Sequence, residues 1–337
     1  MKLLTPARLF IAGLALLVVV LGLLVLPSND YIFLPDVAHP VAPLVVVSGG
    51  HDPSVGGIYF VDVIVRKATW FERLFPEIHN GADLYPAKAI DPPGVDEQQR
   101  QKLDLQDMKL SQQVAAAVAL RALGRKVVLR PIGARVTEVG PGLPSFGKLQ
   151  PGDVLTAVDG KPIRTPRDLS VSMAAHRVGD VVTLTVRRDT QTLVEKIKTI
   201  GVTDPGQKAR PIIGIALPEQ ALDIHLPIQV NIDAHGVGGP SAGVAFALDV
   251  MEELGHDVVH GHKVAVTGEI FADGSIGAIG GVKQKTIGAR AAHVDAFLVP
   301  AGDNAQEARK YAHGLRIIPV DTFPQALRAL ATLSQKG

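Results

Sequence analysis

The sequence contains no cysteine. Disulfide bonds, thiolate metal sites and a cysteine nucleophile are therefore excluded. Aromatic residues make up only 4% of the chain, so the hydrophobic cores must be built mainly from aliphatic side chains.

An excess of charge of one sign is also missing. The 34 basic and 33 acidic residues give a formal net charge of +1. Because nucleic-acid-binding domains usually carry a basic surplus, we expect no nucleic-acid partner. The 337 residues, 47% of them hydrophobic, are enough for two or three folding units.

One long apolar run is present near the N-terminus, from Leu9 to Leu26, and it carries no charge. Eighteen helical residues span about 27 Å, close to the hydrocarbon thickness of a membrane. Lys2 and Arg8 precede the run, and the next basic residue is Arg66. By the positive-inside rule, residues 1–30 are expected to form a cytoplasmic N-terminus and a single transmembrane helix, with the rest of the chain outside the cytoplasm.

A cleaved signal peptide and a buried core helix are the alternatives for this run. The run is long for a signal peptide, and Val25-Leu26-Pro27-Ser28 offers no small-x-small cleavage site. A core helix would need a polar face, which the run lacks. We expect an uncleaved anchor, and whether the mature protein retains it stays open.

Residues 31–126 follow the anchor. An irregular linker is expected from Pro27 to Pro43, strands at 44–48 and 58–66, and a helix at 98–123 that ends at Gly124. These elements are too few to bury a core alone. We therefore expect them to pack on the C-terminal part of the chain, residues 206–337.

Residues 127–205 have a pattern of their own. The string Leu149-Gln150-Pro151-Gly152-Asp153-Val154-Leu155, followed by Val158-Asp159-Gly160, places tight turns on both sides of a short apolar strand. This string resembles a PDZ domain. The resemblance implies an inserted, β-sandwich-like domain that binds peptides by adding a strand to its sheet edge, with a carboxylate-facing loop near residues 131–133.

The same segment contains the spacing of a phosphate-binding loop, from Gly142 to Lys148. Leu149 stands where that loop requires a Mg²⁺-binding Ser or Thr, and a strand is expected next instead of a helix. We expect no nucleotide site, no other cofactor and no metal site.

Residues 206–337 alternate predicted strands and helices, which is typical of a mixed α/β (α+β) domain. Strands are expected at 223–231, 264–267, 296–300 and 316–320, a hairpin at 269–279, and helices at 241–254, 283–293, 304–312 and 322–333.

Ser241 lies in the small-residue segment Gly238-Gly239-Pro240-Ser241-Ala242-Gly243, where a helix is expected to begin. Unpaired N–H groups at a helix start stabilise a developing oxyanion, so Ser241 is a candidate nucleophile. The competing interpretation is a simple N-cap. A base is also needed, and His235 has no spacing that fixes its geometry.

Two lysines could supply that base. Lys283 and Lys285 fall in the first turn of the helix that follows Gly280-Gly281. The helix dipole and burial there would lower a lysine pKa. Solvated surface side chains are the alternative, and Lys283 fits it well.

Three ordered motifs resemble the proteolytic domain of Lon-type Ser/Lys peptidases. They are Gly239-Pro240-Ser241-Ala242-Gly243, Val266-Thr267-Gly268-Glu269-Ile270 and Gly280-Gly281-Val282-Lys283-Gln284-Lys285. The resemblance implies Ser241 as nucleophile, Lys285 as base and Thr267 as the residue that orients the lysine. Gly239, Pro240, Ala242 and Glu269 are the supporting positions. Gly238 replaces the Asp that ATP-dependent Lon proteins commonly carry there.

The whole layout resembles the bacterial PDZ-containing Lon-like proteases. It implies an ATP-independent, membrane-anchored serine endopeptidase that acts on flexible or unfolded proteins, and by analogy a homo-oligomer. The alternative is a non-catalytic PDZ adaptor built on an inactive peptidase scaffold.

Overall fold

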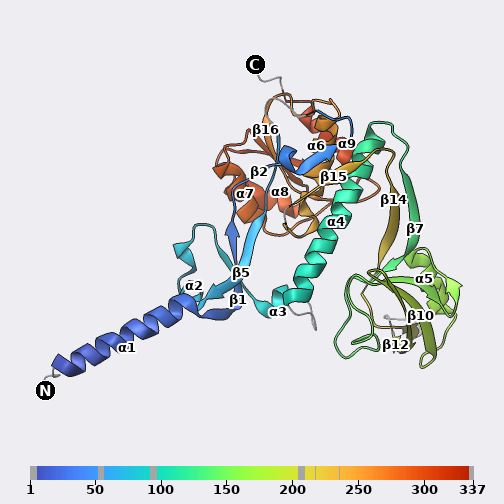
Figure 1. Ribbon diagram of the computed structural model, residues 1–337, viewed down its shortest axis with the longest axis horizontal. Coiled ribbons are helices and arrows are strands. Elements are labelled where there is room, and N and C mark those ends of the chain that lie inside the picture. Colours follow the sequence, from blue (N-terminus) through green and yellow to red (C-terminus); the bar gives the residue numbers. More distant parts are fainter. Residues whose placement is uncertain are drawn as a thin grey trace. The chain divides into compact units, whose positions relative to one another are not determined.

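The computed structural model describes residues 6–51, 57–91, 97–203, 209–216, 218–234 and 236–333, without the side chains of residues 6, 8, 9 and 99. The chain forms two compact units (Figure 1). Unit 1 contains the residues up to Ile90 and those from Ser241 onward, and unit 2 contains Asp91–Pro240. Unit 2 is therefore an insertion in the sequence of unit 1. The domain boundaries expected from the sequence stay predictions.

Unit 1 begins with the helix α1, Pro6–Val25, whose apolar side chains are largely exposed. Among the residues that the structure describes, no helix is both long and apolar enough to cross a membrane. A three-stranded antiparallel sheet follows, in the order β5-β1-β6. Its strands are β1 (Pro27–Pro35), β5 (Val63–Thr69) and β6 (Asp83–Pro86), and the short helices α2 (Trp70–Leu74) and α3 (Ala87–Ile90) follow two of them.

The prediction of an irregular linker from Pro27 to Pro43 was wrong over β1, which is the central strand of this sheet. Both prolines of β1 stand at its ends, where the loss of an N–H donor costs least. The interior residues Tyr31 and Ile32 are buried, so apolar burial outweighs the local signal of the prolines.

The second sheet of unit 1 is a five-stranded sheet in the order β2-β4-β16-β19-β20. Its last four strands are parallel, and only β2 runs antiparallel to its neighbour. The strands are β2 (His39–Pro40), β4 (Gly57–Phe60), β16 (Lys263–Val266), β19 (Ala296–Pro300) and β20 (Arg316–Val320).

Four helices and a hairpin accompany this sheet: α6 (Gly243–Glu253), α7 (Val282–Ala291), α8 (Asp303–Tyr311), α9 (Phe323–Leu330), and β17 (Glu269–Ile270) paired with β18 (Ile276–Gly277). Every residue of β19 is buried, as expected for a parallel strand covered on both faces. These elements agree with the predicted mixed α/β domain. The short strand β3 (Val45–Val47) also belongs to unit 1.

Unit 2 contains the long helix α4, Glu97–Ala122, where the sequence predicts a helix at 98–123. Its main sheet has the order β11-β10-β8-β7-β14. The strands are β7 (Val128–Arg135), β8 (Val154–Val158), β10 (Val181–Arg188), β11 (Gln191–Lys198) and β14 (Glu219–His225). The smaller elements are β9 (Lys161–Pro162), α5 (Pro166–Ala174), β12 (Ile200–Val202), β13 (Arg210–Ile212) and β15 (Val230–Ile232).

The core of unit 2 is aliphatic, with Leu155, Leu184 and Ile197 fully buried. The strand β7 is an interior strand, paired with β8 on one side and β14 on the other. Residues 131–133 lie on β7 and pair with β14. The expected carboxylate-facing loop at this position was therefore wrong, because these residues form a strand that is already paired.

Candidate active site

Ser241 lies on a single 3-10 turn, Pro240–Ala242, that runs directly into α6. The Gly268 N–H donates to the Ser241 carbonyl at 2.8 Å, and the Val244 N–H donates to the Gly268 carbonyl at 3.2 Å. Two backbone bonds thus join the turn to the segment after β16. The N-cap of α6 is Ala242, so Ser241 is not the helix cap that was the competing interpretation.

Lys285 lies on the first turn of α7. The residue before this helix, Gly281, has the left-handed backbone conformation, with φ 68°. Its Nζ is 2.5 Å from Ser241 Oγ and 3.3 Å from Thr267 Oγ1. The residue is only 4% exposed. Burial lowers the pKa of Lys285 to about 8, and the nearby negative charge of Asp62 partly opposes this shift. A substantial fraction of the amine is therefore neutral in mildly alkaline solution.

Thr267 follows β16 and is completely buried. Its hydroxyl donates to the Ser241 carbonyl at 3.2 Å and accepts from Lys285 Nζ. One hydroxyl thus connects the turn of Ser241 to the lysine amine, and the three residues identified by the motifs meet at one point. Because a buried hydroxyl needs hydrogen-bond partners, this geometry restricts where the amine can lie.

Lys283 is oriented differently from Lys285. Its Nζ lies 2.8 Å from Asp83 Oδ1 and 3.2 Å from the Ala82 carbonyl, and it is 5.8 Å from the centre of the Tyr311 ring. The expectation of a solvated side chain was wrong, since the ammonium is held by an ion pair. This fixed position makes Lys283 a natural control for Lys285.

The remaining motif residues shape the backbone around Ser241. Gly239 adopts φ +85°, a left-handed conformation that favours glycine. Its N–H donates to the Asp104 carbonyl of α4, and the Pro240 carbonyl accepts from Ser111 Oγ, also of α4. Ala242 is buried.

Two further residues were considered from the sequence, Glu269 and His235. Glu269 begins the β17–β18 hairpin, where it pairs with Gly277. His235 lies outside the described residues. The described geometry therefore centres on Ser241, Thr267 and Lys285.

Asp62 is a residue that sequence reasoning missed. Its Oδ1 atom is buried without a hydrogen-bond partner. Burial raises the pKa of Asp62, the nearby Asp36 carboxylate raises it further, and the positive charges of His39 and Lys285 lower it. Asp62 lies two residues after the end of β4. The last residue of that strand, Phe60, pairs with Val266 of β16, and Thr267 follows Val266 directly. Neighbouring parallel strands thus deliver both residues to one edge of the sheet.

Asp62, Asp36 and His39 also form the one group among the described residues whose ligand atoms, all within 4.8 Å of one another, could hold a metal ion. His39 Nε2 and Asp36 Oδ2 already pair at 3.5 Å. The electrostatic role of Asp62 toward Lys285 needs no metal.

The fold and the site together define a mixed α/β protein with a Ser/Lys/Thr cluster, in which the lysine and threonine are buried and the serine is half-buried, and with a second, sheet-based unit. Residues 214–332 match the family described as the Lon protease (S16) C-terminal proteolytic domain, and residues 108–199 match the PDZ domain. The first match contains Ser241, Thr267 and Lys285. The chain therefore carries a Lon-type proteolytic domain together with a PDZ domain.

Individual Lon proteases are similar to part of this chain. The Lon protease of Mesomycoplasma hyopneumoniae (strain 232) is 38% identical over 93 residues, which is 26% of this chain and 10% of that protein. Lon protease 2 of Bacillus subtilis (strain 168) is 34% identical over 105 residues, 31% of this chain and 18% of that protein. The chain thus spans less than a fifth of the length of either relative.

Among solved structures, the PDZ domain of the SdrC-like protein from Listeria monocytogenes is 26% identical. The similarity covers 26% of this chain and 87% of that one, with a TM-score of 0.24.

Proposed function

We propose that this protein is an ATP-independent serine endopeptidase with a Ser241/Lys285 dyad. The observation that carries the proposal is the 2.5 Å separation of Lys285 Nζ from Ser241 Oγ, with the lysine buried and its pKa lowered. A lysine can act as the base for a serine when burial keeps it neutral.

The proposed reaction has two stages. Neutral Lys285 accepts the hydroxyl proton while Ser241 Oγ attacks the peptide carbonyl, and the ammonium then donates a proton to the departing amine. In the second stage Lys285 accepts a proton from water, whose oxygen attacks the acyl carbon. The Lys285 ammonium then donates that proton to the departing Ser241 Oγ, which regenerates the serine and the neutral amine and releases a carboxylic acid. N–H groups of the turn before α6 would stabilise the oxyanion, and Thr267 would hold the amine in place.

The substrates in this proposal are flexible or unfolded proteins, as the resemblance to the PDZ-containing Lon-like proteases implies. The PDZ domain would recruit them by strand addition. In the described sheet of unit 2, β11 and β14 end the main strand order, and the two-residue strand β9 pairs only with β8. The longer strands β11 and β14 are the proposed sites of peptide addition.

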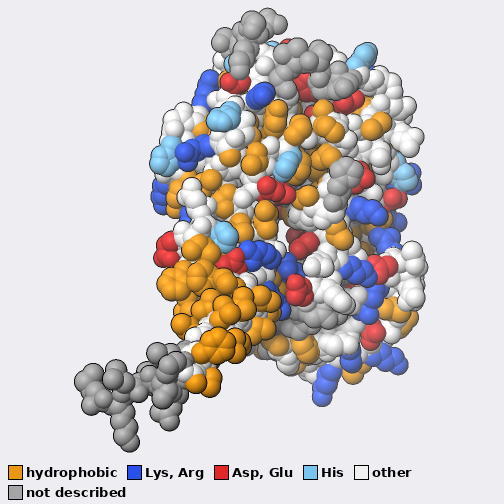
Figure 2. All heavy atoms as spheres, turned by 60° about the vertical axis from the view of Figure 1, so that its left-hand side comes forward, with side chains coloured by type: hydrophobic (Ala, Val, Ile, Leu, Met, Phe, Trp, Pro, Cys, Tyr) orange, Lys and Arg blue, Asp and Glu red, His pale blue; other side chains and the backbone are white. Residues whose placement is uncertain are grey.

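We also propose that the protein acts at a membrane and outside the cytoplasm. Support comes from α1, where Phe10 is 74% and Val25 73% exposed. Figure 2 shows a broad patch of hydrophobic side chains beside the N-terminal helix. Leu26, just after α1, and Leu74 and Phe75, at the end of α2, are exposed as well. Large exposed apolar surfaces mark contacts with membranes or partners.

The dyad is tested by purified full-length Ser241→Ala and Lys285→Met proteins incubated with casein. Both should lose cleavage, by about a hundredfold or more, while retaining the circular dichroism spectrum of the wild type. The matched control is Lys283→Met, which removes a lysine two residues away and should retain most activity. Normal turnover by Ser241→Ala would refute the dyad, whereas a wild type that does not cleave casein would leave the non-catalytic PDZ adaptor as the better interpretation.

The location is tested by labelling a single introduced cysteine, since the natural chain has none. Gln191→Cys places it on an exposed position at the start of β11. A membrane-impermeant maleimide should label it in intact cells. A homo-oligomer, which the resemblance implies, is tested by ultracentrifugation of the detergent-solubilised full chain.

A further inference from the structure

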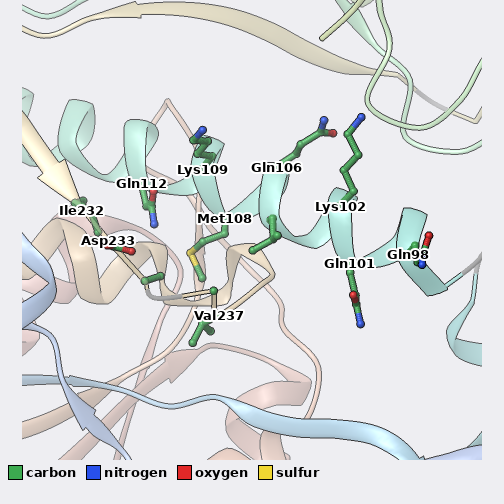
Figure 3. A pocket seen from close by; sticks show the side chains of 13 residues that line it. Gln98, Gln101, Lys102, Gln106, Met108, Lys109, Gln112, Ile232, Asp233 and Val237 are labelled. Atoms are coloured by element: carbon green, nitrogen blue, oxygen red, sulfur yellow. The ribbon is translucent and has the colours of Figure 1, made fainter.

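A groove of about 600 Å³ runs along α4 of unit 2 (Figure 3). One wall is the N-terminal half of α4, and the other is formed by Ile232, Asp233, Ala234, Gly236 and Val237. Both walls belong to unit 2. None of the functions derived so far uses this groove.

The floor of the groove is apolar and its rim is polar. Met108 and Ala234 are buried, and Val237 lies across from the helix. In Figure 3, Met108 extends from α4 toward the segment that carries Val237. Four side-chain amides and two ammonium groups of α4 line the groove: Gln98, Gln101, Gln106, Gln112, Lys102 and Lys109.

This combination suits an extended polypeptide. A side-chain amide both donates and accepts hydrogen bonds, so glutamines can pair with the N–H and C=O groups of a peptide backbone. The apolar floor can take one side chain of the same peptide. Asp189 already pairs with Lys102 at 2.8 Å and accepts from the Gln106 amide at 3.0 Å. The amides of Gln98, Gln101 and Gln112 and the apolar floor are therefore the main attractions.

The segment that forms the second wall of the groove precedes the nucleophile in the chain. Gly239 and Pro240 are hydrogen-bonded to α4 at Asp104 and Ser111, and Ser241 is the next residue. Val237 lies four residues before Ser241, so their Cα atoms are at most about 15 Å apart. An extended peptide covers that distance in roughly four to five residues.

We propose that this groove binds the extended backbone of the substrate polypeptide and that its floor holds one apolar side chain of the substrate. That side chain lies within about four to five residues of the scissile bond. The inference rests on the proposed peptidase function. It identifies the substrate segment near the scissile bond as the part that binds to unit 2.

The kinetic test fills the groove from its rim. Leu105 lines the groove and is 48% exposed, so Leu105→Trp narrows it without disturbing a core. Gln113 is exposed on the same helix and does not line the groove, so Gln113→Trp is the matched control. Two substrates are compared: casein, and a fluorogenic peptide with two residues on each side of the cleaved bond.

For Leu105→Trp we expect the KM for casein to rise about tenfold with kcat unchanged, and no change for the short peptide. Gln113→Trp should change neither. An unchanged KM for casein would overturn the inference. An equal loss on both substrates would do so too, because it would place the defect at the cleaved bond and not in the groove.

A second measurement separates this inference from the peptidase function. Benzoylphenylalanine is placed at position 105 or 113 of the full-length Ser241→Ala chain, which is then irradiated with reduced, carboxymethylated α-lactalbumin. Crosslinking from 105 and not from 113 supports the groove even if the wild type proves inactive. An active wild type with no crosslink from 105 refutes the groove and leaves the dyad intact.

Discussion

Lys285 Nζ lies 2.5 Å from Ser241 Oγ, and the two residues are 44 positions apart in the sequence. Each lies where a helix of unit 1 begins, Ser241 on the turn before α6 and Lys285 on the first turn of α7. The positive end of a helix dipole opposes a protonated lysine and favours negative charge on the serine oxygen or its adduct. Both helix starts therefore favour the charge distribution that attack by the serine requires.

The activity should depend on pH through Lys285. Because its pKa is about 8, the fraction of Lys285 in the neutral form falls about tenfold for each pH unit below that value. We expect kcat/KM at pH 6 to be about 100-fold below an alkaline plateau, with a slope of one on a logarithmic plot. A flat profile between pH 6 and 9 would contradict a lysine base.

Asp62→Asn should move this profile. The negative charge of Asp62 raises the pKa of Lys285 and thus opposes the effect of burial. Without that charge the lysine deprotonates more easily, and the inflection of the pH–rate profile should shift to lower pH. A purely structural role of Asp62 would reduce the plateau and leave the inflection where it is.

Lys285→Met should stabilise the protein at neutral pH. The folded-state pKa of about 8 lies below the ordinary value of 10.5, so the native state resists protonation. The corresponding penalty is at most about 3 kcal/mol, present in full below pH 8 and relieved as the pH rises toward 10.5. Urea unfolding at pH 7 should show a gain for Lys285→Met that shrinks at pH 9.5. An equal gain at both values would assign it to packing.

Thr267→Val keeps the shape of the side chain and removes the hydroxyl that contacts Lys285 and the Ser241 carbonyl. We expect kcat to fall about tenfold to a hundredfold, since a small misplacement of a catalytic group is costly. Thr267→Ser restores the hydroxyl and should recover most of kcat. Equal loss in both variants would contradict a specific role of the hydroxyl, because Thr267→Ser retains it.

Gly288→Ala tests how α7 is placed. A Cβ atom at Gly288 would lie 1.8 Å from the Asp36 carbonyl oxygen, so the helix must move. We expect a loss of about 1–3 kcal/mol in the free energy of unfolding together with reduced kcat, because Lys285 lies one turn earlier. Gly280→Ala, with no atom within 4 Å of its Cβ, is the control and should change neither quantity.

Local motifs carried the sequence predictions furthest. The turn at Ser241, the helix of Lys285 and the strand before Thr267 each follow from short segments, and the structure has elements at all three places. Their roles stay predictions that the experiments above test. The strand β1 was missed because its two prolines resemble a linker, whereas its burial depends on two distant strands, β5 and β6.

The position of Asp62 could not be predicted from local sequence. Its place beside Lys285 depends on the parallel pairing of β4 with β16, two strands about 200 residues apart in the chain. No motif near Asp62 in the sequence indicates that it lies beside Lys285. The groove along α4 was missed for the same reason, since its walls come from the start and the end of unit 2.

The burial of α6 gives the site a further property. Every residue from Gly243 to Met251 is buried, so the helix that follows the nucleophile is itself part of the hydrophobic core. Such a segment exposes its amides to solvent only when the whole unit opens. Loss of activity in denaturant should thus coincide with global unfolding, and the amides of α6 should exchange with deuterium as slowly as the most protected ones in the protein.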